Sequence, residues 1–327
     1  MGLIATVKER YAENMLVRYD GDPAVNHFCP GDFEGLCYEE YSFLSGKNRL
    51  SARFYYYPCP RKDSLVVFDH GLGHGHTAYL REIEMLARRG YLVFAYDHTG
   101  CMASEGKSVG GFSRSPADLF AAISALKQEE ALGGRKILAV GHSWGGFAVL
   151  NVGARHPDVT AAVAISGFRS AKAMMEQSLP FLLRPLKRHV LRIEEENNGD
   201  CARLDAVKSL KTGGVPTLVI HGDSDPVVHY KKHFLPILRA QLPNVTCRTA
   251  TGRGHSPHYA EDAERYMREF FRERTARAEE IAKAGGEAFS SQYDFWRMTR
   301  QDRELWAEIF SFLEEKAKPK ETEAGLS

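Results

Sequence analysis

The sequence predicts an α/β fold with a mostly parallel sheet of eight strands flanked by helices and an inserted helical cap. Three observations predict it. Short apolar runs with strand-like composition recur along the chain, helix-like stretches separate the later runs, and one long interval interrupts the alternation.

Eight runs rich in β-branched and aromatic residues are the expected strands. They cover residues 36–43, 50–57, 65–68, 91–96, 137–140, 159–165, 215–220 and 245–249. The first two indicate an antiparallel hairpin. The later runs alternate with helix-like stretches at residues 78–89, 116–132, 144–155 and 230–242, as expected of right-handed βαβ units. A doubly wound sheet follows.

The domain organisation is a core with an insertion. Residues 168–212 separate two strands that one helix could join, so we interpret them as a helical cap on a core of residues 1–167 and 213–317. The N-terminus is expected to be disordered or to lead into a strand, and residues 318–327 are expected to be disordered.

A second departure follows the last strand. Residues 260–272 and 305–313 have helical apolar spacing, and between them residues 275–303 form an extra excursion. Its aromatic residues are favoured for packing, although they could shape the pocket or bury a homodimer contact. They are Phe289, Tyr293, Phe295 and Trp296.

Charge and cysteine content limit the partners. Forty-three basic and forty-two acidic side chains nearly cancel, so we expect no nucleic-acid partner and a small neutral or amphiphilic ligand instead. The six cysteines lack disulfide-like density and are expected to be reduced. With no signal-like or spanning N-terminal segment, we expect a cytoplasmic protein without stable membrane insertion.

The strongest motif is the sequence Gly-His-Ser-Trp-Gly at positions 141–145, between a predicted strand and a helix-like run. This is the context of a nucleophile elbow, in which a strained turn exposes the serine. A side chain at Gly141 or Gly145 would collide with neighbouring backbone. Ser143 is therefore the expected nucleophile.

A serine hydroxyl needs a base, and the base needs an acidic partner. Asp223 and Asp225 follow the strand at 215–220, and spacing alone does not separate them; we favour Asp225. His255, in a glycine loop after the last strand, is the expected base. His258 is its alternative and is otherwise expected on the surface of the following helix. The order Ser, Asp, His is the one this fold imposes.

Acyl transfer also needs amide donors for an oxyanion. The residue after the nucleophile supplies one, here Trp144, and the loop after the third strand supplies the other, for which Leu72 is our candidate. His70, His74 and His76 in that loop are expected to line the mouth of the site. They lack the further ligands of a metal site, and the glycines among them lack the spacing of a dinucleotide loop. We expect no metal or cofactor.

These residues together resemble the α/β-hydrolase superfamily, in the branch of monoacylglycerol lipases, lysophospholipases and serine aminopeptidase-like hydrolases. The resemblance rests on the His-Gly-x-Gly loop at His70, the elbow at Ser143, the His-Gly-x-x-Asp run ending at Asp225 and the glycine-flanked His255. The segment from Asp97 departs from the family pattern, with Thr99 in place of an arginine and Met102 in place of a glycine. In similar enzymes the cap forms a wall of the acyl or leaving-group pocket.

The resemblance implies a serine hydrolase that cleaves a carboxylic ester of a small acyl substrate, of esterase, lipase or lysophospholipase type. Apolar cap residues suggest an acyl-chain site, and His70, Met174, Met175 and Phe181 are the expected substrate contacts. The cap apolar stripe could instead pack on the core. An acyl-CoA thioesterase, an aminopeptidase, a perhydrolase with the same triad or a non-hydrolytic binding member of the fold are the alternatives.

Overall fold

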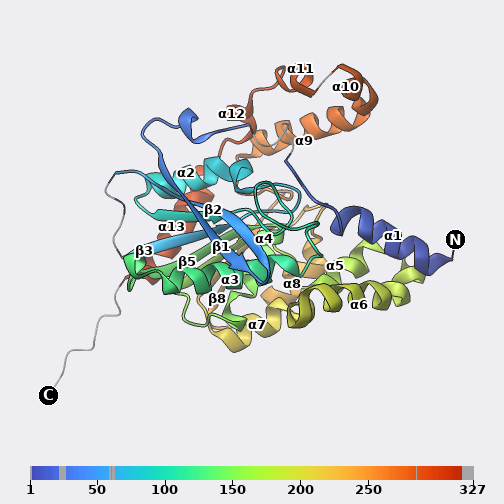
Figure 1. Cartoon of the computed structure of the whole chain (residues 1–327), viewed down its shortest axis with the longest axis horizontal. Helices are drawn as coiled ribbons and strands as arrows, with labels where there is room; N and C mark the ends of the chain where they lie inside the picture. Colours follow the sequence, from blue (N-terminus) through green and yellow to red (C-terminus); the bar gives the residue numbers. More distant parts are fainter. Residues whose placement is uncertain (1, 22–26, 59, 61–62, 285, 319–327) are drawn as a thin grey trace.

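A central eight-stranded sheet organises the computed structural model, which describes residues 2–21, 27–58, 60, 63–284 and 286–318 (Figure 1). The strand order is β1-β2-β4-β3-β5-β6-β7-β8. The strands are β1 (Cys37–Ser45), β2 (Asn48–Tyr56), β3 (Ser64–Asp69), β4 (Leu92–Tyr96), β5 (Lys136–His142), β6 (Ala161–Ile165), β7 (Thr217–Gly222) and β8 (Val245–Ala250). The hairpin β1-β2 and the β2-β4 pair are antiparallel, and all pairs from β4 to β8 are parallel. The predicted mostly parallel sheet of eight strands is confirmed.

Burial along the strands explains their composition. Every residue of β3, β4, β6 and β7 is buried, because helices cover both faces of the sheet there. By contrast, most residues of the outer strands β1 and β8 are exposed or half-buried. Because β5, β6, β7 and β8 are parallel, the carboxyl ends of β5, β7 and β8 lie at one edge of the sheet. The loops at this edge can bring their side chains together.

Two hydrophobic clusters lie on opposite faces of the sheet. One contains apolar residues of α3 (Arg114–Gln128), α4 (Trp144–Leu150), α7 (Ala206–Gly213) and α8 (Tyr230–Arg239). The other contains residues of α2 (Leu80–Arg88) and α13 (Arg303–Ala317), including the fully buried Trp306. Short 3-10 helices occur at η1 (Pro30–Asp32), η2 (His76–Tyr79), η3 (Glu130–Leu132) and η4 (Val152–Ala154).

Residues 168–212, which are predicted as a cap and are called the cap below, are mostly helical. The cap contains α5 (Ala171–Ser178), η5 (Phe181–Leu186), α6 (Lys187–Asn198), η6 (Gly199–Arg203) and α7. Ser170 begins α5 by accepting a hydrogen bond from the amide of Ala173. The side chain of Asp205 caps α7 in the same way.

The N-terminus differs from the expectation. Residues Leu3–Met15 form helix α1, which lies beside α6 of the cap (Figure 1). The buried Tyr11 hydroxyl donates a 2.5 Å hydrogen bond to Glu194 of α6. Glu194 also accepts from the amides of Phe112 and Ser113. The expectation of a disordered or strand-leading terminus is wrong, because Val7, Tyr11 and Met15 give α1 an apolar stripe that packs on the cap.

The excursion after the last strand is a small helical unit that is larger than predicted, because it includes the helix before residue 275. It runs through α9 (Glu261–Ala276), α10 (Ala278–Ala284), α11 (Gly286–Ser290) and α12 (Phe295–Met298), before α13 returns to the sheet. Phe270, Phe289 and Met298 form its buried centre, with Tyr293 and Phe295 packed against them. The favoured packing role holds for these aromatic residues, whereas Trp296 is half exposed and meets the rings of Phe28 and Phe33.

Three further expectations concern the chain as a whole. The described cysteines are free thiols, and Cys59 lies outside the described residues. The predicted disordered tail likewise lies outside them from residue 319 onward. Among the helices of the described ranges, none has the length and apolar character needed to cross a membrane.

Candidate active site

The turn between β5 and α4 places Ser143 in a strained conformation. Ser143 has φ 57° and ψ −110°, in a region that non-glycine residues rarely adopt. A Cβ at Gly141 would lie 2.6 Å from the carbonyl oxygen of Gly145, and one at Gly145 would lie 2.1 Å from that of Asp69. The two glycines therefore allow the strand, the turn and the helix to approach closely, as the motif predicts.

Three loops at the sheet edge bring the predicted triad residues together. Oγ of Ser143 lies 2.9 Å from Nε2 of His255, and Nδ1 of His255 lies 2.8 Å from Oδ2 of Asp225. These residues follow β5, β8 and β7 respectively. The arrangement has the order and hydrogen-bond reach that an activated serine nucleophile needs.

Asp225, not Asp223, faces His255. Its second oxygen, Oδ1, accepts hydrogen bonds from the amides of Val227 and Val228 at 2.7 and 2.9 Å. Burial acts to raise the pKa of Asp225, but hydrogen bonds from His221 and His255 outweigh it and hold that pKa well below its ordinary value. Asp223 is exposed and accepts instead from the amide of Gly252.

His258, the alternative base, lies elsewhere. It is buried, and its Nε2 is 3.2 Å from Oε1 of the buried Glu82 on α2. The expected surface position on the following helix is therefore wrong, because the segment before α9 turns inward and α9 begins only at Glu261. His255 is the histidine that reaches Ser143.

The two predicted amide donors border the same space as the serine. Leu72 and Trp144 both line the cavity that contains Ser143 and His255. The loop before Leu72 approaches the nucleophile so closely that a Cβ at Gly71 would lie 3.5 Å from Cβ of Ser143. Within the described residues, neither the Leu72 nor the Trp144 amide has an acceptor of its own. Both N–H groups are therefore available to an oxyanion.

Comparison with known proteins gives the same fold. Residues 60–204 match the family model described as serine aminopeptidase, S33. The esterase Pf2001 of Pyrococcus furiosus superposes with a TM-score of 0.56 at 20% identity, covering 79% of this chain and 95% of that one. Est1E of Butyrivibrio proteoclasticus, in a structure with ferulic acid bound, gives 0.52 at 18% identity, covering 72% and 99%. The chain has the α/β-hydrolase fold.

One segment of the chain also resembles a curated protein. Over 98 residues, 29% of the chain, it is 33% identical to the probable esterase PIR7A of Oryza sativa subsp. indica. The match spans 35% of that protein's length. The family-model match ends at residue 204, so Asp225 and His255 lie beyond it and rest on the geometry described above.

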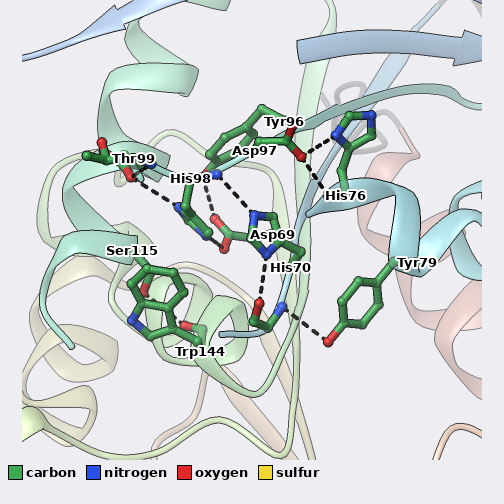
Figure 2. A network of polar contacts seen from close by, with 12 residues as sticks. Asp69, His70, His76, Tyr79, Tyr96, Asp97, His98, Thr99, Ser115 and Trp144 are labelled. Atoms are coloured by element: carbon green, nitrogen blue, oxygen red, sulfur yellow. Dashed lines mark hydrogen bonds and ion pairs between the residues drawn. The ribbon is translucent and has the colours of Figure 1, made fainter. Parts of the chain in front are cut away.

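His70 lies behind the cavity wall and not within it, which corrects the predicted substrate contact. It is fully buried, and its Nε2 accepts a 3.0 Å hydrogen bond from the amide of His98. Nδ1 consequently carries the proton and donates to the carbonyl oxygen of Gly71 at 2.7 Å (Figure 2). Burial and the nearby His98 lower the pKa of His70, which keeps the ring neutral. His70 thus fixes the backbone of the loop that carries Leu72.

The other two histidines of that loop also differ in whether they reach the cavity. His74 lines the cavity, as expected. His76 is buried and its Nδ1 lies 2.7 Å from Oδ1 of Asp97, so the expectation that it lines the mouth is wrong (Figure 2). In the described parts of the chain, no three His, Cys, Asp or Glu side chains gather as a metal ion would require.

A buried Asp-His-Asp cluster lies beneath the elbow. His98 Nε2 is 2.7 Å from Asp69 Oδ1, and its Nδ1 is 3.3 Å from Asp118 Oδ2. Burial alone would lower the pKa of His98, but the two carboxylates raise it to about 9, so the ring is an imidazolium at neutral pH. Thr99, which stands where the family has an arginine, donates to Asp118 from both its amide and its hydroxyl. His98 is the imidazolium in contact with Asp118.

The cavity has a volume of about 460 Å³ and contains Ser143 and His255 in its wall. Its apolar lining comes from three parts of the chain. Besides the core loops, the segment 168–212 supplies Phe168 and Met174, and the C-terminal excursion supplies Met267, Phe271 and Met298. The pocket lies between the cap and the excursion.

Two predicted substrate contacts in the cap do not reach this cavity. Met175 is buried in the apolar centre of the cap, one position along α5 from Met174, so it points inward. Phe181 is 76% exposed at the start of η5 and does not line the cavity. Of the four predicted contacts, Met174 is the one that the structure places in the cavity wall.

Sequence reasoning overlooked several residues that hold the site. His221, at the start of the His-Gly-x-x-Asp run, lies 3.3 Å from Asp225 and 2.7 Å from the Val228 carbonyl oxygen. His142, inside the elbow motif, bonds to the His255 carbonyl oxygen. His142 belongs to the motif of Ser143, and His221 belongs to the motif of Asp225. Their positions within these motifs are the sequence feature that indicates them. The cavity-lining residues of α9 and α12 lie in no recognisable motif.

Proposed function

We propose that this α/β-hydrolase cleaves carboxylic esters of small acyl substrates through a covalent acyl-enzyme on Ser143. The observation that carries the proposal is the continuous hydrogen-bond chain from Ser143 Oγ through His255 to Asp225, at 2.9 and 2.8 Å. A serine hydroxyl at neutral pH is a poor nucleophile unless such a base removes its proton.

In the acylation step, Nε2 of His255 takes the proton of Ser143 as Oγ attacks the carbonyl carbon of the ester. The amides of Leu72 and Trp144 stabilise the negative charge on the carbonyl oxygen. The imidazolium of His255 is stabilised by Asp225, whose lowered pKa keeps it ionised. His255 then donates its proton to the leaving alkoxide oxygen, and the ester carbon–oxygen bond breaks.

In the deacylation step, the same groups act on water. His255 Nε2 removes a proton from a water molecule that attacks the acyl carbon, and the oxyanion again lies against the Leu72 and Trp144 amides. Collapse of this intermediate returns the proton to Ser143 Oγ and releases the carboxylic acid. The resting hydrogen-bond chain is then restored.

The cavity lining favours an ester with an apolar acyl part. Phe168 and Met174 on one side and Met267, Phe271 and Met298 on the other offer apolar surface to a hydrocarbon chain. An aminopeptidase would need a carboxylate for the substrate ammonium group. The acidic residue among the described lining residues, Glu264, already pairs with Arg253 at 3.2 Å. A thioester is the alternative bond that the same machinery would cleave.

Hydrolysis of 4-nitrophenyl esters tests the proposal. We expect turnover by the wild type, with kcat/KM rising from the acetyl to the octanoyl ester as more apolar surface is buried. Ser143→Ala should abolish it, and Ser124→Ala, at an exposed serine of α3, should not. Absence of turnover with a folded wild type, or equal turnover by Ser143→Ala, would overturn the proposal. A preference for acetyl esters would overturn only the acyl-chain part.

A further inference from the structure

The cavity has two walls of different origin. The cap side is built by Phe168 and by Met174 of α5, and the opposite side by α9 and α12. In Figure 1 the helices α9 to α12 lie at the top of the molecule, well separated from α6 of the cap. The second wall belongs to the excursion that follows β8. Its residues are Met267, Arg268, Phe271, Met298 and Thr299.

This second wall is rigidly joined to the loop that carries the base. The amide of Ala260 donates to the carbonyl oxygen of Arg300 at 2.7 Å, and the amide of Asp302 donates to that of His258 at 2.8 Å. Arg253 of the same loop also binds Asp302, at 3.1 Å. A group bound by α9 and α12 is therefore held at a fixed position relative to His255.

Arg268 is the cation of this wall. A Cβ placed on Gly254 would lie 3.7 Å from Nη1 of Arg268, so the guanidinium stands beside the residue that precedes His255. The side chain is exposed and lines the cavity, next to the apolar Met267 and Phe271. A guanidinium presents planar N–H donors that suit carboxylate and phosphate oxygens.

The carboxylates near Arg268 are engaged by other groups. Glu264, one helical turn earlier, pairs with Arg253 at 3.2 Å and accepts from the amide of Ser256 at 3.3 Å. Asp302 pairs with Arg253 as well. Within the described ranges, the guanidinium of Arg268 forms neither an ion pair nor a hydrogen bond with another side chain. Its N–H donors are therefore available to a ligand in the cavity.

We propose that the wall formed by α9 and α12 is a subsite for a substrate that carries an anionic group at the end of an apolar segment. Met267, Phe271 and Met298 contact the apolar segment, and Arg268 binds the terminal carboxylate or phosphate. This inference deepens the proposed function and rests on it for the reaction. The binding of the anionic group by Arg268 does not depend on turnover.

Two matched pairs of esters test the subsite and separate its possible ligands. One pair is mono-4-nitrophenyl adipate and 4-nitrophenyl hexanoate, which differ in a terminal carboxylate. The other is 4-nitrophenyl 6-phosphooxyhexanoate and 4-nitrophenyl hexanoate, which differ in a terminal phosphate. For each pair the ratio of kcat/KM, charged over neutral, is measured for the wild type, Arg268→Gln, Arg268→Lys and Arg265→Gln. Arg265 is the control because it is exposed on the same helix but does not line the cavity.

We expect the wild-type ratio to exceed one in at least one pair and to fall about fivefold or more in Arg268→Gln, since one charge-assisted hydrogen-bond pair is lost. Arg268→Lys should retain part of the ratio, and Arg265→Gln all of it. Turnover of the neutral ester should change less than about twofold in Arg265→Gln, and added salt should reduce the wild-type ratio. The pair that responds identifies carboxylate or phosphate as the ligand.

Equal ratios in the wild type and Arg268→Gln for both pairs would overturn the subsite and leave the proposed esterase function intact. If the wild type hydrolyses no ester, the proposed function fails, and binding decides the subsite separately. For that case, calorimetry compares the same pairs on Ser143→Ala with and without Arg268→Gln. Tighter binding of a charged ester that depends on Arg268 supports the subsite, and its absence overturns it.

Discussion

Nε2 of His142 donates a 2.9 Å hydrogen bond to the carbonyl oxygen of His255, so the residue before Ser143 holds the loop that carries His255. His142 Nδ1 accepts from the Tyr79 hydroxyl at 3.0 Å, and that hydroxyl accepts from the Gly71 amide at 3.1 Å. Burial, with His258 and His255 nearby, lowers the pKa of His142 and keeps it neutral, as this directional chain requires. One chain of hydrogen bonds thus joins the oxyanion loop, the elbow and the base.

Removing the Tyr79 hydroxyl should loosen this chain. In Tyr79→Phe the Gly71 amide and His142 Nδ1 both lose their partner while buried, which costs about 1–2 kcal/mol. Because the oxyanion loop and the base lose alignment together, we expect kcat for ester hydrolysis to fall about tenfold with little change in KM. Steady-state kinetics check this against Tyr56→Phe, whose hydroxyl binds Glu39 at the surface. An unchanged kcat in Tyr79→Phe would contradict a positioning role.

Replacing the acid of the triad should separate the two candidate aspartates. Asp225→Asn removes the carboxylate that fixes the His255 tautomer, and kcat should fall by a factor on the order of 10³–10⁴. Asp223→Asn should keep most of the activity, because Asp223 binds the Gly252 amide and does not contact His255. Comparable losses in both variants would argue against the assignment of Asp225.

The buried imidazolium of His98 should make stability depend on pH. Its pKa is raised to about 9 in the folded state, against an ordinary value near 6.5 in the unfolded chain. The folded state therefore binds the extra proton, so the stabilisation is complete below pH 6.5 and is lost as pH rises towards 9. Urea unfolding should show a decrease on the order of 2–3 kcal/mol across this window. His98→Gln should be less stable at pH 6.5 and lack this decrease; a flat wild-type profile would contradict a protonated His98.

The close approach at the elbow predicts a severe effect of a single methyl group. Gly145→Ala places a Cβ 2.1 Å from the Asp69 carbonyl oxygen, a backbone atom that cannot move without shifting β3. We expect a loss of about 2–4 kcal/mol in the free energy of unfolding. Gly286→Ala, where a Cβ meets no heavy atom within 4 Å, is the matched control and should be neutral or slightly stabilising. Chemical denaturation of both variants checks the prediction.

The sequence predicted the elements whose signal is local. All eight strands were expected because buried parallel strands consist of continuous runs rich in β-branched and aromatic residues, as in β3 and β4. The elbow was expected because its glycines are required by contacts within a few residues, as the approach of Gly141 to Gly145 illustrates. Parallel strands place their loops at one edge, which explains why Ser143, Asp225 and His255 could be grouped from their order alone.

The remaining features depend on side-chain direction and on contacts distant in the chain. Met174 and Met175 differ by one position on α5, yet one lines the cavity and the other is buried in the cap. His70 belongs to a loop expected to line the pocket, but its hydrogen bonds to His98 and Gly71 hold it behind the cavity wall. Helix α1 is stabilised by the contact of Tyr11 with Glu194 of α6, which is distant in the sequence. The sequence of the N-terminal segment alone therefore did not predict a helix.

The central claim is that Ser143 is the nucleophile, and covalent labelling tests it most directly. The wild type is treated with a fluorophosphonate, and peptide mass spectrometry locates the phosphonyl adduct. We predict one adduct, on the peptide that contains Ser143, and none in Ser143→Ala or in His255→Ala on the same time scale, because the base is needed to activate the serine. An adduct on another residue, or no adduct on the folded wild-type protein, would contradict the account.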